Sequence, residues 1–437
     1  MFNEALLKKL KKSSTVRRIA FGGFWSVFGV VSEKAISLAS IVFVVRLLGK
    51  ESYGLFAILQ STLAMAGVFA ALGLGTTATK HVAELKFSNP ERLGRILTMT
   101  RRLSYGAGFL LLILLALGSP FICGHILHQP ELVRILPFAA IAVVLNTIDG
   151  YQSGVLLGFE AVRKTALAYL AAAFISAPVF IVLTYWQGLN GAVVGLICVA
   201  AMRYIVSSFI LKECLNNAGI QLGVSDWRQE WTVFRNFALP SFLSGLAITP
   251  AHWICHTMLI NSVGGKGEMA VLGIANQWYF SVLFIPMAAG RILLPVLTDL
   301  ASNSSMKNSN RVVLLTVMAN LIIMLPAVIV LGILSPWIMT FYGHEYVSHS
   351  GVLVAMVAAA GSYSICMPIG HMLTVSNKMW AGFTLNIFWG VTYVAISFLL
   401  LDKGALGVAL ALLSAYLFHG FTSFIMAWLV VLRKKSA

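Results

Sequence analysis

Residues 46–60 read Arg-Leu-Leu-Gly-Lys-Glu-Ser-Tyr-Gly-Leu-Phe-Ala-Ile-Leu-Gln, and this short stretch separates two long apolar runs. Within it, Gly49 and Gly54 allow the backbone to bend at little cost, because glycine carries no Cβ. Two apolar runs joined by a short polar link predict a transmembrane helical hairpin. A weaker copy of the pattern, a link followed by small residues and a glutamine, occurs at 262–277. We therefore expect two halves of one membrane protein, each opening with the same hairpin.

The composition of the 437-residue chain indicates its broad class. The chain is 59% hydrophobic and 11% charged, with a mean hydropathy of +0.88, whereas soluble domains carry about 25% charged residues. These values predict a polytopic membrane protein. The net charge of +16 is a feature of some nucleic-acid-binding proteins, but the positions of the basic residues indicate a topology bias instead. We expect no nucleic-acid partner.

Apolar runs of about 20 residues, the length that a spanning helix needs, occur about twelve times in the chain. We therefore predict an all-α polytopic protein with about twelve transmembrane helices. The predicted spans are 20–46, 54–78, 104–124, 135–159, 166–187, 191–211, 236–260, 271–297, 312–338, 350–375, 381–401 and 408–431.

The lysines and arginines predict the orientation, because cytoplasmic loops are enriched in them. With a cytoplasmic N-terminus, the inner links and the termini hold 23 of the 31 basic residues, and the outer links hold five. Both termini are then cytoplasmic. The polar link 212–235 leaves six spans on each side, which predicts two six-helix lobes related as a parallel repeat around a central cavity.

The predicted domain organisation has five parts. They are a basic, interfacial N-terminal segment (1–19), an N-lobe of six helices (20–211), a cytoplasmic inter-lobe linker (212–235), a C-lobe of six helices (236–431) and a basic cytoplasmic tail (432–437). The outer links are short throughout, which leaves no room for an external catalytic domain.

Five lysine, arginine, aspartate or glutamate residues fall well inside predicted spans, where a charge is costly and usually faces a cavity or a partner. They are Glu33, Lys34, Asp149, Arg203 and Arg291, and each is a candidate substrate-binding residue of the cavity. Alternatives remain open for most of them. In the alternative to a cavity role, Glu33 would pair with a basic side chain, and Asp149 would form a structural ion pair with Arg203. For Arg291, the alternative is a side chain that extends to the inner interface.

A second group of candidates lies in the seventh span, where His252 and His256 are four residues apart and share a helix face. Trp253, rather than glutamate, follows the first histidine, so the zinc-protease motif is absent and we expect no metal site. The pair either lines the cavity and titrates near neutral pH or packs through hydrogen bonds. Together with Glu33 and Asp149, it is a candidate site for a coupling proton or Na⁺.

Several short motifs resemble those of one transporter family. Residues 45–56 are similar to the R-x-L-G-x-x-x-Y-G-x-[FY] turn of polysaccharide flippases, and residues 72–75, Leu-Gly-Leu-Gly, are similar to that family's end of helix two. Residues 237–240 (Phe-Ala-Leu-Pro) and 294–297 (Leu-Pro-Val-Leu) are similar to its marks of helices seven and eight. In the order and spacing of these motifs, the chain resembles the Wzx-type flippases of O-antigen and other lipid-linked oligosaccharides, in the multidrug/oligosaccharidyl-lipid/polysaccharide exporter superfamily.

This resemblance implies a transporter of the bacterial inner membrane, not an enzyme, with no cofactor apart from a coupling proton or Na⁺. The implied function is to flip polyprenyl-pyrophosphate-linked oligosaccharide repeat units from the cytoplasmic to the periplasmic leaflet by alternating access, for O-antigen or other surface polysaccharide. Lys34 stands where the family commonly has a basic residue. The expected partners are the lipid-linked substrate, membrane lipids and, as candidates, a polysaccharide polymerase and a chain-length regulator.

Two other functions remain open. A cation-coupled drug or metabolite antiporter of the same superfamily would favour an acidic cavity, whereas three basic residues and two carboxylates lie within the predicted spans. A polytopic glycosyltransferase or polymerase would need a catalytic group of residues in a sizeable loop, and the sequence contains no such loop.

Overall fold

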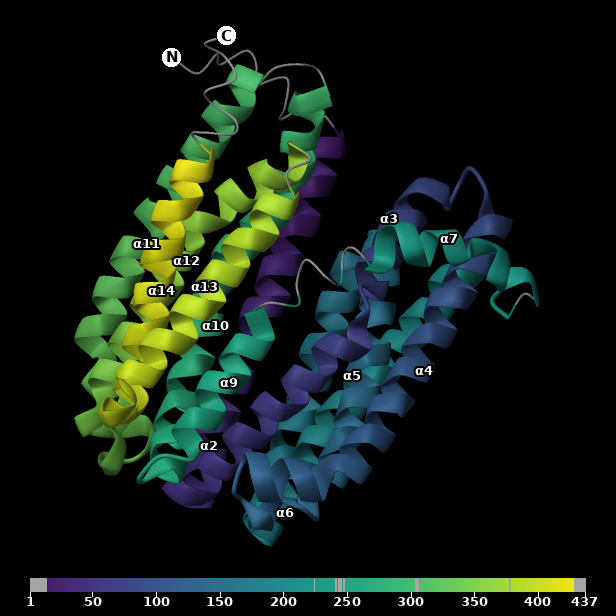
Figure 1. Ribbon diagram of the computed structural model, residues 1–437. Coiled ribbons are helices and arrows are strands. Elements are labelled where there is room, and N and C mark those ends of the chain that lie inside the picture. Colours follow the sequence, from purple (N-terminus) through teal and green to yellow (C-terminus); the bar gives the residue numbers. More distant parts are fainter. Residues whose placement is uncertain are drawn as a thin grey trace. The chain divides into compact units, whose positions relative to one another are not determined.

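The computed structural model describes residues 14–223, 225–239, 242, 246, 248–302, 306–376 and 379–427. In this part of the chain, helices alternate with short links and there is no β-strand (Figure 1). Nine of the described helices are long and apolar enough to cross a membrane. The helical fold follows from the apolar sequence, because a backbone in lipid must satisfy its polar groups through its own hydrogen bonds.

Two helices have the length of two membrane spans, and each bends at one glycine. In α2 (Ser14–Ala71) Gly49 has a φ of 71°, and in α6 (Val162–Asn217) Gly188 has a φ of 54°. Such values are strained for a residue that carries a Cβ. Both bends lie in links that the sequence predicts, between spans one and two and between spans five and six. The complete twelve-helix layout, six plus six with cytoplasmic termini, stays a prediction.

The described residues form two compact units. Those within 1–41, 69–116 and 137–241 make unit 1, and those within 42–68, 117–136 and 242–437 make unit 2. Unit 2 therefore contains segments from both predicted lobes, and the lobe boundaries themselves stay predictions.

Unit 1 contains the N-terminal part of α2, α3 (Leu74–Leu85), most of α4 (Pro90–Phe121), most of α5 (Ile135–Gly158), and α6. It ends with the short helices η3 (Ser225–Glu230), α7 (Trp231–Val233) and η4 (Phe234–Ala238). Gly75 and Gly154 allow α3 and α5 to approach closely, since a Cβ on Gly154 would overlap the backbone of Gly75. At this crossing the Thr79 hydroxyl donates a hydrogen bond to the carbonyl oxygen of Gly154 at 2.8 Å.

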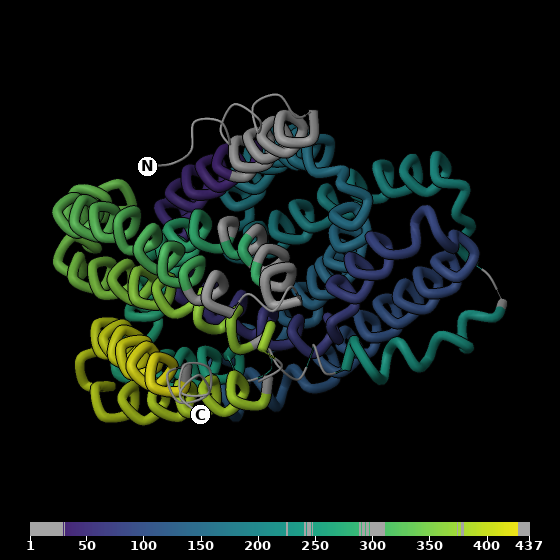
Figure 2. Tube along the Cα trace, turned by 90° about the horizontal axis from the view of Figure 1, so that it is seen from above, coloured from purple at the N-terminus to yellow at the C-terminus, as the bar shows by residue number. Residues whose placement is uncertain are grey.

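Unit 2 contains residues 42–68 of α2 and a bundle of helices from the second half of the chain. In this bundle α12 packs against α10, α11 and α14 (Figures 1 and 2). Besides its part of α2, unit 2 has the short elements η1 (Ile122–Ile126) and η2 (Pro130–Leu132). The bundle consists of α9 (Ile248–Ile260), α10 (Gly265–Ser302), α11 (Met306–Tyr342), η5 (His344–His349), α12 (Ser350–Val375), α13 (Met379–Leu399), η6 (Leu401–Lys403) and α14 (Gly404–Ala427).

The α2 segment of unit 2 is buried in this bundle. Tyr53 and Phe56 have no exposed surface. Gly273 of α10 lies against Ala57, and a Cβ added to this glycine would stand 2.8 Å from the Cβ of Ala57. The second hairpin of the chain therefore packs against the first through small residues.

Candidate functional site

Three of the ionisable residues predicted inside spans meet in unit 1, in a group that we call the Arg203 cluster. Its central side chain comes from α6: Nη1 of Arg203 bonds Oε1 of Glu33 on α2 at 2.5 Å, and Nε bonds Oδ2 of Asp149 on α5 at 3.4 Å. The Asp149 side chain is 8% exposed, that of Glu33 21% and that of Arg203 34%. Both ion pairs considered from the sequence are therefore present, and they share one guanidinium group.

Hydroxyl groups complete the Arg203 cluster, and Tyr169 is the residue that connects them. Oδ1 of Asp149 accepts hydrogen bonds from the Ser207 hydroxyl at 2.6 Å and from the Tyr169 hydroxyl at 3.1 Å. The Tyr169 hydroxyl is also 2.8 Å from the hydroxyl of Ser153, and its ring centroid is 4.3 Å from Cζ of Arg203. The guanidinium is thus held by two carboxylates and by the face of an aromatic ring.

Helical spacing places these partners together. Arg203 and Ser207 are four residues apart on α6, and Asp149 and Ser153 are four apart on α5, so each pair shares one helix face. This spacing was available in the sequence as a signal for Ser207. Tyr169 lies on the other arm of α6, before the bend at Gly188, so its approach depends on the tertiary fold.

The charge balance of the Arg203 cluster limits what it can bind. Two carboxylates and one guanidinium leave one formal negative charge when all three are ionised. An ionised group removed from water needs a partner, and here the cation already has two. In this arrangement Arg203 is therefore committed to Glu33 and Asp149, and an anionic ligand would have to compete with them.

Of the two other charges predicted inside spans, only Lys34 has a described side chain, and it does not join these ion pairs. Lys34 is exposed on α2, and it forms no hydrogen bond or ion pair with any residue that the structure describes. Arg291 lies in α10, and its side chain falls outside the described part of the chain.

The histidine pair lies in unit 2, on α9. Nδ1 of His256 is 2.7 Å from the hydroxyl oxygen of Ser61 on α2. Beside it, the indole N–H of Trp253 donates to the hydroxyl oxygen of Thr62 at 3.1 Å. These two bonds connect the first hairpin with the helix that opens the second half.

His252 makes a different kind of contact. Its ring centroid is 5.5 Å from that of Trp389 and 5.2 Å from that of Tyr393, both on α13. The two histidine rings are 6.0 Å apart and tilted. These contacts fit the alternative in which the pair packs and bonds within the protein, and a role in proton coupling stays a prediction.

Replacement of His256 by phenylalanine should destabilise the protein by about 1–3 kcal/mol, because the Ser61 hydroxyl then loses its buried partner. His252→Phe is the matched control, since it keeps an aromatic ring against Trp389 and Tyr393. Thermal unfolding of the two purified variants in one detergent measures the difference. Equal melting temperatures for the two variants would contradict this assignment.

The stretch 46–60 also takes part in contacts within unit 2. Nε of Arg46 donates to the carbonyl oxygen of Phe341 at 2.6 Å, and Nη2 donates to that of Thr340 at 3.3 Å. These carbonyls belong to the last turn of α11, where backbone acceptors lack helical partners. Gly54 lies so close to Lys266 that an added Cβ would overlap the Lys266 backbone. Residues at the facing ends of the first two predicted spans therefore fix the first hairpin to the second half.

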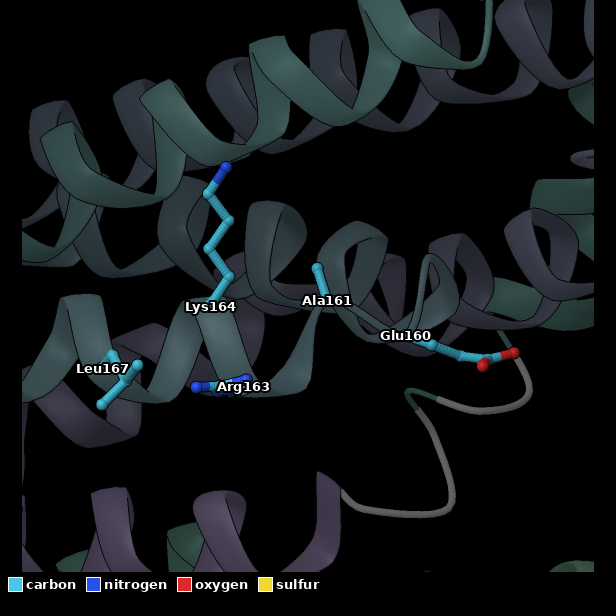
Figure 3. Close-up of a pocket in the computed structure, with 5 residues that line it drawn as sticks. All are labelled: Glu160, Ala161, Arg163, Lys164 and Leu167. Atoms are coloured by element: carbon cyan, nitrogen blue, oxygen red, sulfur yellow. The ribbon is translucent and has the colours of Figure 1, made fainter. Parts of the chain in front are cut away.

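One open cavity lies in unit 1, at the start of α6, with a volume of about 400 Å³. It is lined by Glu160, Ala161, Arg163, Lys164 and Leu167 (Figure 3). Oε1 of Glu160 pairs with Nζ of Lys86 at 3.3 Å, and Lys164 pairs with Glu213. None of the candidate site residues predicted from the sequence lines this cavity.

Comparison with solved structures identifies the fold. The fold matches the inward-facing conformation of a multidrug resistance MATE family transporter of the MOP superfamily, with a TM-score of 0.76 and 16% identity, covering 94% of this chain and 100% of that chain. It also matches the inward closed conformation of the lipid II flippase MurJ, with a TM-score of 0.70 and 14% identity, covering 92% and 87% of the two chains. The protein therefore has the fold of these multi-pass transporters.

Sequence comparison then identifies the family. Residues 19–301 match the model of the polysaccharide biosynthesis protein family, and the chain belongs to that family. The EPS I polysaccharide export inner membrane protein EpsE of Ralstonia nicotianae is 26% identical over 418 residues, covering 89% of this chain and 88% of the relative. A putative O-antigen transporter of Shigella flexneri is 22% identical over 410 residues, covering 89% and 92%. The resemblance drawn from the short motifs is confirmed, and so is the inner-membrane location.

Proposed function

We propose that this transporter flips a polyprenyl-pyrophosphate-linked oligosaccharide repeat unit from the cytoplasmic to the periplasmic leaflet. The observation that carries the proposal is the family match over residues 19–301, and the relatives named for polysaccharide export and O-antigen transport support it. The name of one structural neighbour, a lipid II flippase, favours a lipid-linked cargo. The repeat units would supply O-antigen or another surface polysaccharide, with a polymerase and a chain-length regulator as proposed partners.

The physical problem that such a protein solves is the transfer of a polar head group through hydrocarbon. A hydroxyl group that is removed from water without a new hydrogen bond costs about 2–7 kcal/mol, and an ionised group costs far more. An oligosaccharide on a pyrophosphate carries many such groups. Alternating access removes this barrier, because the head group crosses in a polar path through the protein. The polyprenyl tail can stay in the lipid throughout.

Lys34 is the residue that we propose for the first contact with the pyrophosphate. Lys34 is exposed and directly follows Glu33 of the Arg203 cluster in α2, and charge-assisted bonds to phosphate are strong. Arg203 would contribute only after it leaves a carboxylate, and Arg291 remains a further candidate.

The Lys34→Ala variant should reach the membrane in normal amounts but export at least tenfold less polysaccharide, because the pyrophosphate charge loses its cation. Lys34→Arg is the matched control and should retain most of the export, since it keeps the charge. The measurement is the amount of surface polysaccharide, divided by the amount of each variant in the membrane. Full export by Lys34→Ala would remove this residue from the mechanism.

For energy coupling, we propose a proton at the Glu33 and Asp149 carboxylates, rather than Na⁺. The guanidinium of Arg203 already occupies the position between them that a metal cation would need. Protonation of one carboxylate would weaken its bond to Arg203 and free the guanidinium for the substrate. The histidine pair on α9 is the alternative proton site.

Deletion of the gene tests the proposed function against an antiporter. A flippase predicts that lipid-linked repeat units accumulate in the cytoplasmic leaflet and that surface polysaccharide is lost. Complementation with the intact gene should reverse both effects. Normal surface polysaccharide together with increased sensitivity to cationic drugs would overturn the flippase and favour the cation-coupled antiporter.

A further inference from the structure

Residues 225–238, which we call the inner-face segment, are fixed to unit 1 by a buried ionic anchor. Glu230 is 5% exposed. Its carboxylate pairs with Nε of Arg92 at 3.2 Å and with Nε of Arg95 at 3.5 Å. Val233 is buried against Ile96 of α4. A segment that the sequence presents as a polar linker is thus an ordered part of the unit, and η4 packs against α3.

The opposite face of the inner-face segment combines exposed aromatic and basic side chains. Trp231 is 48% exposed, and its ring centroid is 4.9 Å from that of Phe234. Arg228 and Arg235 are exposed on either side of it in the sequence. The guanidinium carbon of Arg228 also lies 5.6 Å from the ring centroid of Trp227. Tryptophan interleaved with arginine is typical of segments that lie in a membrane–water interface.

Neighbouring helices add further cations to this face. Cζ of Arg102 on α4 is 5.3 Å from the ring centroid of Trp227, and Nζ of Lys80 on α3 is 4.3 Å from that of Phe237. The nearby carboxylates face basic groups: Glu84 lies 3.9 Å from Lys80, while Glu230 is covered by its two arginines. Positive charge therefore predominates, although Asp226 is also exposed.

The place of the inner-face segment in the chain sets its depth in the membrane. It follows α6, which ends at Asn217, and its last three residues overlap the start of the next predicted span at residue 236. A segment between two spans, on the side with the excess of lysine and arginine, lies at the cytoplasmic surface. There the inner leaflet presents anionic phosphates to basic side chains.

We propose that the inner-face segment binds the head groups of anionic phospholipids of the cytoplasmic leaflet. Arg228 and Arg235 bind lipid phosphates through charge-assisted hydrogen bonds, and the Trp231 indole lies among the glycerol groups. Because the Glu230 ion pairs fix the segment to α4, a lipid bound to the segment is coupled to the position of α4. This binding is independent of the exported substrate, and it would make transport depend on the charge of the bilayer.

Native mass spectrometry of the purified full chain tests this binding, with phosphatidylglycerol and phosphatidylcholine as probes. The protein should retain phosphatidylglycerol preferentially. The double variant Arg228→Gln, Arg235→Gln should bind phosphatidylglycerol at least tenfold more weakly, because two phosphate contacts are lost, with phosphatidylcholine binding unchanged. Both positions are exposed and leave the Glu230 anchor in place, so thermal stability should not change.

The matched control is Arg134→Gln, Lys403→Gln, which removes two exposed cations on the predicted outer side and should leave phosphatidylglycerol binding at the wild-type level. Equal binding of the two lipids by the wild type would overturn the proposal, and a protein partner would then be the alternative ligand of this face. Undiminished selectivity in the Arg228, Arg235 variant would overturn it as well.

Discussion

We expect Arg203→Gln to abolish export and to lower the free energy of unfolding by about 3 kcal/mol, the lower part of the range for breaking a buried ion pair. The substitution leaves Glu33 and Asp149 without their shared cation, and Asp149 is 8% exposed. The Tyr169 ring also loses the guanidinium that it faces. Thermal unfolding in detergent and surface polysaccharide yield are the two measurements.

A triple variant separates lost charge balance from lost packing. Glu33→Gln, Asp149→Asn, Arg203→Gln replaces the two carboxylates with neutral amides of the same shape and the guanidinium with a shorter neutral amide, and a neutral replacement of a buried ionic group is often tolerated. We expect it to regain most of the stability lost by Arg203→Gln while still failing to export. A triple variant no more stable than the single one would show that charge balance is not what Arg203 provides.

The second large effect is expected at Gly54. Glycine to alanine inside a helix usually stabilises a protein by about 0.4–1 kcal/mol, where the backbone conformation is compatible with alanine. Here the added methyl group overlaps the backbone of Lys266, so Gly54→Ala should instead destabilise by about 1–3 kcal/mol. The first hairpin would separate from α10, and the nearby Arg46 bonds to α11 would weaken.

Gly67→Ala is the control for this prediction. Gly67 lies on the same helix, and no heavy atom stands within 4 Å of the Cβ that would be added there. Thermal unfolding should therefore show opposite signs for the two variants. If Gly54→Ala is as stable as Gly67→Ala, the close approach of α2 and α10 does not exist in the protein.

Much of the fold could be predicted from the sequence, because hydrocarbon imposes helices and glycine marks where they turn. The bends at Gly49 and Gly188 lie in the predicted links. The grouping of residues into units could not be read in the same way. The sequence presents 46–60 as a link, whereas Arg46 bonds carbonyls nearly 300 residues away, and no local pattern encodes such a contact.

The candidate site was predictable in its charges but not in its arrangement. Charge within an apolar run identifies Glu33, Asp149 and Arg203, because burial of an ion demands a partner or a cavity. The pairing of one guanidinium with both carboxylates depends on the way α2, α5 and α6 cross. Tyr169 carries no charge and gave no comparable signal, although it contacts both Asp149 and Arg203.

Reconstitution tests the proposed function most directly. The purified protein is reconstituted in liposomes that carry a polyprenyl-pyrophosphate-linked oligosaccharide in one leaflet. A glycosidase added outside cleaves only the sugar in the outer leaflet and so reports which leaflet holds it. We predict translocation that is driven by a proton gradient, is indifferent to Na⁺ and is lost in the Lys34→Ala variant. Unchanged leaflet distribution in liposomes that hold folded protein under either ion gradient would contradict the flippase.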